Sequence, residues 1–497
     1  MKKIYLETFG CQMNLLDSEL VQNQLTTLGY TFTPVLNEAQ VVLYNTCSVR
    51  ELAEQKVWSR LGLIKERKAT LQKAGAENLI VGVIGCMAER DGLSLLKRMP
   101  QVDLLCGPSE LDQLPALLEN ALLTGRQQHA LAGNTARRSK TLDHATETTD
   151  GLESLDLSRS FSPTEARYQA YIRIVRGCNK FCSYCVVPYT RGPEISRSPQ
   201  VILEEAQKLV AAGCLEITLL GQTVNHYVYE SPTPTISTAT GPAHARTTFP
   251  ELLSLLHDQL PDLPRLRFVT SFPADFSLDI LHVMANSPRI CRYLHMPAQS
   301  GSNRILSLMK RGYTAESYLE LLAQARKIVP NIALAGDIIV GFPSETEEDY
   351  AATRHLLETA RYKNCFIFKY SPRPGTLAIK RLPDDVPDET KRQRNNDLLQ
   401  VQNRISVELN RELIGQEVEI LCEGPSGWKG SGNAESVVAG AQQVVELGPK
   451  LSGYLRDTNA AISKNSATSP ELTQLTGRTT SDQIVVFDGA PSLEGSI

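Results

Sequence analysis

The sequence predicts an α/β protein with three successive domains, and three observations carry this prediction. Apolar, β-prone runs alternate with helical patterns over residues 1–123 and again over residues 166–412. Strands that alternate with helices indicate parallel sheets. Residues 413–497 have the alternating pattern of β-strands instead. A length of 497 residues agrees with about three domains.

Composition places the chain among ordinary globular proteins, with 42% hydrophobic and 21% charged residues. No apolar run is long enough for a signal peptide or a membrane span, so we expect a cytoplasmic protein without a membrane partner. The 11 cysteines then favour metal ligands or buried thiols over disulfides. The formal net charge of −4 does not by itself indicate a polyanionic partner.

The first domain, residues 1–123, contains strand-like runs that are each followed by a helical pattern. These runs cover residues 4–8, 41–45, 79–85 and 102–106. Cys11, Cys47 and Cys86 follow the first three runs, and Cys106 follows the fourth in a context, LLCGPSE, that lacks the flanking pattern of the others. The carboxyl ends of parallel strands lie at one edge of a sheet, so the first three cysteines are expected to converge. They form either a three-thiolate metal site or a set of small buried hydrophobic residues.

Residues 124–165 are predicted to be a linker, because they are rich in Thr, Ser, Gly and charge and have no sustained apolar period. The strand–helix pattern then resumes in the second domain, residues 166–412. Strands are expected at residues 171–176, 215–221, 265–270, 292–296, 332–340 and 364–370. Such a series indicates a partial (β/α)6 barrel that is open on one side. Residues 229–248, rich in Pro, Thr and Ser, are predicted to be a surface insertion.

Cys178, Cys182 and Cys185 lie in the loop after the first barrel strand, at Cys-x-x-x-Cys-x-x-Cys spacing. Three thiolates in one short loop can ligate three irons of a cubane cluster and leave the fourth iron open. A structural zinc site needs four ligands, and no fourth Cys or His lies nearby. An odd number of cysteines also fits poorly with disulfides, so the spacing favours an open iron–sulfur site.

Polar side chains follow several barrel strands on the face that would hold this cluster. They include Gln222, Asn225, Ser271, Gln299 and Ser300. Hydroxyls and amides that converge on one barrel face favour a ligand site when they are taken as a set. Each of them taken singly is explained equally well by helix capping or another structural role.

Charge is unevenly distributed around the cysteine loop. Residues 165–197 contain six positive and two negative side chains. This basic patch would contact phosphates or form a solvated rim. Arg311 is expected near the same face, in contact with a ligand or with RNA. The charged helix predicted at residues 388–413 is expected to have a solvated face.

The cysteine motifs resemble those of the radical S-adenosylmethionine (SAM) methylthiotransferases. The resemblance rests on IVRGCNKFCSYCVVPYTRG at residues 174–192 and on TFGCQMN, YNTCSVRE and VIGCMAER in the first domain. It implies two [4Fe-4S] clusters as cofactors, one on Cys11, Cys47 and Cys86 and one on the loop trio of Cys178, Cys182 and Cys185. It also implies that SAM is the second kind of cofactor. Segments similar to the family's SAM-binding segments contain Tyr184, Gln222, Ser271 and Gln299, whereas Phe272 stands where the family leads us to expect His.

The resemblance also implies a substrate and partners. The motif sequences are most similar to those of the branch that adds a methylthio group to carbon 2 of isopentenylated adenosine next to the anticodon of tRNA. The branches that act on threonylcarbamoyladenosine in tRNA or on a ribosomal-protein aspartate are the alternatives, together with a non-enzymatic iron–sulfur RNA-binding or sensor protein. We expect the tRNA anticodon loop and an electron-donor protein as partners, and a monomeric enzyme.

Residues 413–497 resemble the small β-barrel (TRAM) module with which family members bind tRNA. Residues 413–424 and 475–487 supply the strand-like patterns, and residues 426–469 form a polar insertion between them. The module is expected to be incomplete, because the strand patterns end shortly after residue 487.

Overall fold

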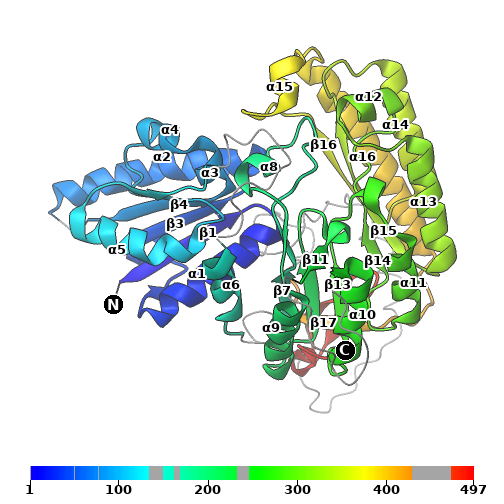
Figure 1. Ribbon diagram of the computed structural model, residues 1–497, viewed down its shortest axis with the longest axis horizontal. Helices are drawn as coiled ribbons and strands as arrows, with labels where there is room; N and C mark the ends of the chain where they lie inside the picture. The colour runs from blue at the N-terminus through cyan, green and yellow to red at the C-terminus, as the bar shows by residue number, and fades with distance from the viewer. Residues whose placement is uncertain are drawn as a thin grey trace.

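A computed structural model describes residues 2–49, 51–75, 78–133, 149–161, 168–231, 246–427 and 472–497 of the chain. It contains an N-terminal α/β domain, a central barrel-like domain and a small C-terminal sheet, as Figure 1 shows. The predicted α/β fold class is confirmed.

The N-terminal domain is built around one parallel sheet with the strand order β2-β1-β3-β4-β5-β6. Its strands are β1 (Lys3–Phe9), β2 (Thr31–Phe32), β3 (Val41–Thr46), β4 (Ile80–Gly85), β5 (Leu104–Cys106) and β6 (Gln128–Ala130). β3 and β4 are buried along their whole length, as expected for strands that are covered on both faces.

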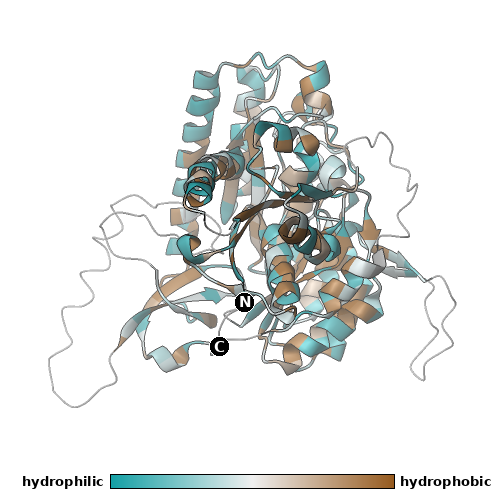
Figure 2. Cartoon of the chain, turned by 90° about the vertical axis from the view of Figure 1, so that its left-hand side faces the viewer, coloured by the Kyte–Doolittle hydropathy of each residue, from teal (hydrophilic) through white to brown (hydrophobic). Residues whose placement is uncertain are grey.

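Helices cover both faces of this sheet. They are α1 (Gln12–Thr27), α2 (Glu51–Lys73), α3 (Cys86–Asp91), α4 (Leu93–Arg98), α5 (Leu114–Thr124) and α6 (Thr149–Leu157). Alternate residues of a strand point to opposite faces, so Val41 and Leu43 pack in the same core as α1, α5 and α6. Val42 and Tyr44 pack in a second core with α2, α3 and α4. Figure 2 shows the apolar strands enclosed by helices with polar outer surfaces.

Two parts of the predicted linker are structured. Residues 128–130 form β6 at the edge of the sheet, and α6 packs on α1 through Leu152 and Leu155. The predicted linker thus contains one short strand and one helix among its described residues. Residues 134–148 and 162–167 lie outside the described residues.

The central domain is the predicted partial barrel. Its strands are β7 (Gln169–Arg173), β10 (Glu216–Leu220), β13 (Arg265–Phe268), β14 (Tyr293–His295), β15 (Ala333–Val340) and β16 (Asn364–Lys369). The order β7-β10-β13 continues through a parallel bridge between Leu266 and Ile290 into β14-β15-β16. No strand pair among the described residues joins β16 back to β7, which agrees with an open barrel wall.

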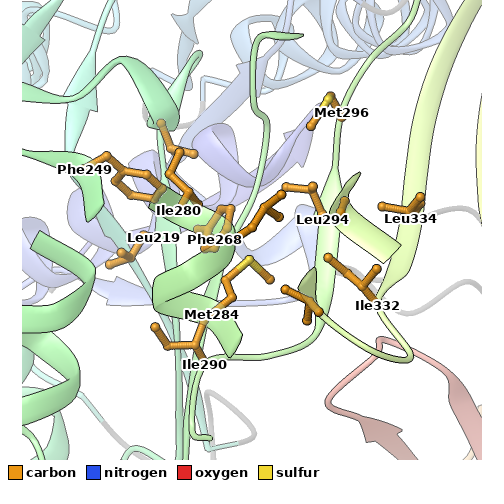
Figure 3. Packing of buried hydrophobic residues seen from close by; sticks show 14 of the residues in the cluster. Leu219, Phe249, Phe268, Ile280, Met284, Ile290, Leu294, Met296, Ile332 and Leu334 are labelled. Atoms are coloured by element: carbon orange, nitrogen blue, oxygen red, sulfur yellow. The ribbon is translucent and has the colours of Figure 1, made fainter. Parts of the chain in front are cut away.

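The barrel strands are held by apolar side chains and surrounded by helices. These are α9 (Pro199–Ala211), α10 (Phe249–Gln259), α11 (Leu278–Asn286), α12 (Asn303–Leu308), α13 (Ala315–Ile328), α14 (Glu347–Ala360) and α16 (Asp388–Arg411). Figure 3 shows Leu219, Phe268 and Leu294 from successive strands packed near Ile280 and Met284 of α11. This core keeps the carboxyl ends of the strands at one common face.

Shorter elements lie in the connections. The strands are β8 (Val175–Arg176), β9 (Ile195–Ser196), β11 (Val228–Glu230) and β12 (Arg246–Thr248), and the helices are α8 (Val187–Thr190) and α15 (Leu377–Arg381). The 3-10 segments are η1 (Leu36–Glu38), η2 (Leu111–Gln113), η4 (Val224–His226), η5 (Pro273–Asp275) and η7 (Pro491–Leu493). β11 and β12 pair as the base of the predicted insertion, of which residues 232–245 lie outside the described residues.

The C-terminal part is an antiparallel sheet of β17 (Ile420–Pro425), β18 (Thr473–Thr479) and β19 (Ile484–Gly489). Nearly all of the predicted polar insertion falls in residues 428–471, outside the described residues. The sheet docks on the amino ends of the barrel strands, where Asp482 forms ion pairs with Arg267 and Lys363. In Figure 1 this sheet lies at the bottom of the barrel, α15 lies at the top, and α8 lies between the barrel and the N-terminal domain. None of the described helices is long and apolar enough to cross a membrane.

Candidate metal centre

The first three cysteines follow three neighbouring strands of the N-terminal sheet. Cys11 and Cys47 come after β1 and β3, and Cys86 begins α3 directly after β4. Thr46 pairs with Phe9 on one side and with Gly85 on the other. The strand register therefore brings the three chain ends to one place, as the spacing of one strand–helix unit predicts.

The three thiols also interact with one another. The adjacent Cys11 thiol and burial together raise the pKa of Cys47 well above its usual range. Burial raises the pKa of Cys86 as well, and the nearby Arg191 opposes this rise. Because crowded, buried thiols resist ionisation, a cationic group is needed to stabilise three thiolates here, and metal binding releases their protons.

Close packing around Cys11 and Cys47 depends on small residues and on buried amides. A Cβ added to Gly10 would lie 2.7 Å from the Cβ of Cys47. The Asn14 side chain accepts a hydrogen bond from the Cys11 backbone at 3.4 Å and donates one to the Asn45 side chain at 3.0 Å. These contacts fix the loop that follows β1 against the end of β3.

Cys106, at the end of β5, has a different environment. Its thiol donates to the backbone carbonyl of Glu110 at 3.1 Å and is fully buried. The thiol is thus used in the local structure of its own loop.

The second cysteine trio lies at the carboxyl end of the first barrel strand. Gly177 has a φ of +68°, and an added Cβ would collide with the backbone carbonyl of Pro193. The Cys178 backbone donates to the carbonyl of Gly192 at 3.1 Å, which closes the loop. The Ser183 hydroxyl donates to the carbonyl of Leu308 at 2.7 Å. These hydrogen bonds therefore fix the conformation of the loop that carries the trio.

Burial and neighbouring thiols shape the ionisation of this loop trio. Burial is the main cause that raises the pKa of Cys178 far above its usual range and that of Cys185 to about 12. Among the described residues, no three His, Cys, Asp or Glu side chains are grouped so as to hold a single metal ion. A cubane cluster places each cysteine on a separate iron, so it requires ligands around a larger volume than one ion does.

The two cysteine trios lie next to each other across the domain boundary. α8, which follows Cys185, packs against α3, which begins at Cys86, and Figure 1 shows the two helices side by side. The Cys86 thiol is close enough to affect the ionisation of Cys185. The arrangement can therefore place two metal clusters next to each other at the domain boundary.

The polar residues predicted at the barrel face divide into two groups. Asn225 bonds to the backbone of Phe272 at both its amide atoms, and Ser300 contacts Thr353, so these two are structural. In contrast, Gln222 Oε1 and Ser271 Oγ are buried and have no hydrogen-bond partner among the described residues. Buried polar atoms are normally paired, so these two orphaned atoms fit the binding of a polar ligand.

Gln299 and Tyr184 complete the predicted set. Gln299 has a φ of +72° and bridges to Ile338 of β15 through its backbone. The Tyr184 hydroxyl accepts a hydrogen bond from Arg311 at 3.4 Å. Both residues thus lie at the face where the loop trio lies.

Comparisons with known proteins match both halves of the chain. Residues 3–107 match uncharacterized protein family UPF0004, and residues 172–357 match the radical SAM superfamily. A tRNA-2-methylthio-N(6)-dimethylallyladenosine synthase of Rhodopirellula baltica is 42% identical over 489 residues, which cover 98% of this chain and 90% of that protein. The chain belongs to the radical SAM methylthiotransferase family. A protein of the same name from Phocaeicola vulgatus is 42% identical over 86% of this methylthiotransferase and 86% of the relative.

A solved structure shares the fold. The radical S-adenosylmethionine methyltransferase TsrM from Kitasatospora setae, with cobalamin and a [4Fe-4S] cluster bound, has a TM-score of 0.52 and 16% identity to this methylthiotransferase. The match covers 76% of this chain and 74% of that chain. At this identity the likeness concerns the fold alone.

Four of the six positive side chains predicted to form a basic patch around the cysteine loop of this methylthiotransferase are not on the surface. Arg173, Arg176, Arg191 and Arg197 are all buried. Their carboxylate partners are Asp17, Glu153, Asp156 and Glu205. Both interpretations of the patch, a phosphate site and a solvated rim, are therefore wrong for these four arginines, which join the two domains and α6.

A similar correction applies to α16. Lys391 and Arg394 are buried and paired with Asp384 and Glu345, so the expected solvated face is wrong for them.

Sequence reasoning also missed Asp17, which binds Arg173 at 3.0 Å and Arg191 at 2.7 Å. Its place between apolar residues in LLDSEL was a signal, because a carboxylate on the buried side of a helix requires a partner.

Proposed function

We propose that this methylthiotransferase adds a methylthio group to carbon 2 of the isopentenylated adenosine next to the anticodon of tRNA. One observation supports the proposal: two separate cysteine trios lie next to each other across the domain boundary, where α8 packs against α3. Each trio could leave one iron of a cubane without a protein ligand. A relative that is 42% identical over 98% of the chain has the corresponding name.

Each of the two domains would hold one of the two clusters. Cys178, Cys182 and Cys185 would hold the cluster that binds SAM, and Cys11, Cys47 and Cys86 would hold the auxiliary cluster. When bound, these groups supply a radical that activates an inert carbon, together with the sulfur and the methyl group that are added. The barrel face would orient SAM through Gln222 Oε1 and Ser271 Oγ, the two buried atoms that lack partners among the described residues, with Gln299 and Tyr184 at the same face.

The substrate must reach this site as a single exposed base. An anticodon loop allows a base to be unstacked and presented to an enzyme, and the open barrel wall gives room for a large partner. The C-terminal sheet lies at the opposite end of the barrel, so we expect it to contact tRNA away from the modified base. An electron-donor protein is the second partner, and the enzyme acts as a monomer in the cytoplasm.

A product assay tests the substrate. The full chain is reconstituted anaerobically with iron and sulfide and is given SAM, a reductant and isopentenylated tRNA. Mass spectrometry is expected to detect the methylthio product at the adenosine. Product with threonylcarbamoyladenosine tRNA alone, or on a ribosomal-protein aspartate alone, would contradict the proposal.

The cluster assignment is tested separately by iron content and by SAM cleavage. Two cubanes predict about eight irons per chain. Replacement of Cys11, Cys47 and Cys86 by Ala is expected to halve the iron and to leave 5′-deoxyadenosine formation detectable. Replacement of Cys178, Cys182 and Cys185 is expected to halve the iron and to abolish that product. SAM cleavage that is lost in the first variant, with its remaining iron intact, would contradict the assigned roles.

A further inference from the structure

Arg311 is a buried cation at the loop trio of Cys178, Cys182 and Cys185. It lies shortly after α12 and is only 5% exposed. One guanidinium nitrogen lies 3.4 Å from the Cys182 sulfur, and another donates to the carbonyl of Pro297 at 2.9 Å. The Arg311 side chain is therefore held directly against a proposed cluster ligand.

The part of the chain that the structure describes gives this guanidinium no carboxylate partner. Arg311 donates to the hydroxyl of Tyr313 at 2.9 Å, and its guanidinium carbon lies 4.4 Å from the centre of the Phe272 ring. Among the described residues, Arg311 forms no ion pair with Asp or Glu. A buried charge is costly unless an opposite charge compensates it. The thiolate of Cys182, and through it the cluster, is the negative group that this site provides.

The other trio has an arginine as well, but its charge is neutralised. Arg191 lies near Cys86 and is bound by the Asp17 carboxylate at 2.7 Å. The two trios therefore differ in local charge: a positive charge at the loop trio is not balanced by a carboxylate, whereas the positive charge at the N-terminal trio is balanced.

We propose that Arg311 is the counter-charge of the cluster on the loop trio and makes this cluster easier to reduce than the cluster on Cys11, Cys47 and Cys86. Reduction transfers one electron from a low-potential donor to the cluster and makes the cluster more negative by one charge. Positive charge and a hydrogen bond at a cysteine sulfur stabilise the reduced form and raise the reduction potential. The Phe272 ring, which replaces the expected His, shields the guanidinium from water, and a low dielectric strengthens this effect.

Arg311 is thus a positioning and tuning residue that acts through Cys182. The inference rests on the proposed cluster assignment, but it does not depend on which substrate is modified. It also directs the electron: a donor that can reduce only the cluster of higher potential delivers its electron to the cluster that binds SAM.

The test is a redox titration without SAM or tRNA, followed by electron paramagnetic resonance with dithionite as the reductant. The full chain with Cys11, Cys47 and Cys86 replaced by Ala isolates the loop cluster. In this background, Arg311→Met is expected to lower the equilibrium constant for reduction at least tenfold, which is about 59 mV for a one-electron couple. Arg311→Lys keeps the charge and is expected to shift the potential less. Lys310→Met removes a neighbouring exposed charge and is expected to leave the potential unchanged.

An unchanged potential in Arg311→Met at full iron content would overturn the proposal. If Arg311→Met does not retain its cluster, Arg311→Gln and Arg311→Lys are compared, since both donate hydrogen bonds and only Lys is charged. Equal potentials in these two variants would also overturn it. The N-terminal cluster, isolated by replacing Cys178, Cys182 and Cys185, is expected to titrate at a lower potential than the loop cluster. The reverse order would contradict the inference even if the tRNA product were confirmed.

Discussion

At the scale of single residues, the cysteine loop depends on a backbone conformation that only glycine adopts without strain. Gly177 has a φ of +68°, and its missing side chain leaves room for the carbonyl of Pro193. A side chain at Gly177 would separate Cys178 from Gly192 and break the 3.1 Å hydrogen bond between their backbones. The backbone conformation of Gly177 therefore sets the position of the Cys178 thiol.

Gly177→Ala is expected to lower the iron content by about half, because one of two cubanes can no longer assemble. The measurement is iron per chain after reconstitution. Gly125→Ala is the matched control, since Gly125 also has a positive φ, +65°, but an added Cβ would meet no atom within 4 Å. Full iron in the Gly177 variant would show that the loop tolerates the side chain.

The convergence of the cysteines was predictable because its signal is local in the sequence. The six cysteines follow strand patterns or stand in one short motif, so spacing alone indicated where they converge. The buried arginines were not predictable, because Asp17 lies 156 positions before Arg173 in the sequence. A count of charges in a window cannot find a partner at that separation, and it mistakes a buried ion pair for a basic surface.

At the scale of elements, the turn between β18 and β19 closes the lower end of the barrel. Asp482 in this turn is bound to Arg478 at 2.7 Å and to Lys363 at 3.1 Å. Burial opposes its ionisation, but Arg478, Lys363 and Arg267 together lower the pKa of Asp482 to about 2. The C-terminal sheet is therefore attached by a buried carboxylate among three cations.

Asp482→Asn is expected to destabilise the docked sheet at neutral pH by about 3 kcal/mol, the typical cost of breaking a buried ion pair. The unfolded Asp pKa is about 3.9, so the stabilisation is present above that pH and is lost as pH falls towards 2. The difference between wild type and variant should therefore shrink below about pH 4. Amide hydrogen exchange in β18 and β19 measures this difference in stability between wild type and variant.

Asp488→Asn is the control, because Asp488 is exposed on β19 and its replacement should change stability by less than about 0.5 kcal/mol. Equal exchange rates in the two variants at neutral pH would contradict the role of Asp482.

The element boundaries themselves were largely predictable from apolar periodicity. β2 and β6 were missed because they comprise only two and three residues, and so short a run has no measurable period.

At the scale of the whole molecule, the N-terminal domain and the barrel are joined by buried charges. Asp17 of α1 binds Arg173 before the cysteine loop and Arg191 after it. On the other side of the site, Arg373 donates to the carbonyl of Val49 at 3.0 Å and pairs with Glu54 of α2. These contacts hold the two cysteine trios at a fixed position relative to each other.

Asp17→Asn is expected to lower the stability of the interdomain contact by about 3 kcal/mol, because two buried arginines lose a carboxylate. Differential scanning calorimetry of the full chain measures the change in unfolding temperature. Glu19→Gln on the same helix is the control, since Glu19 is partly exposed and its pair with Arg159, at 3.5 Å, contributes at most about 1 kcal/mol. A similarly small shift of the unfolding temperature in both variants would argue against a stabilising interdomain ion pair at Asp17.

The position of Asp17 has a consequence for the order in which the protein is made. A ribosome releases α1 long before it releases Arg173 and Arg191, and a desolvated carboxylate without its cations is costly. The N-terminal domain therefore gains its final packing around Asp17 only after the cysteine loop has been synthesised. Completion of the two cysteine sites is thereby linked in time, because the packing around one of them depends on the segment that contains the other.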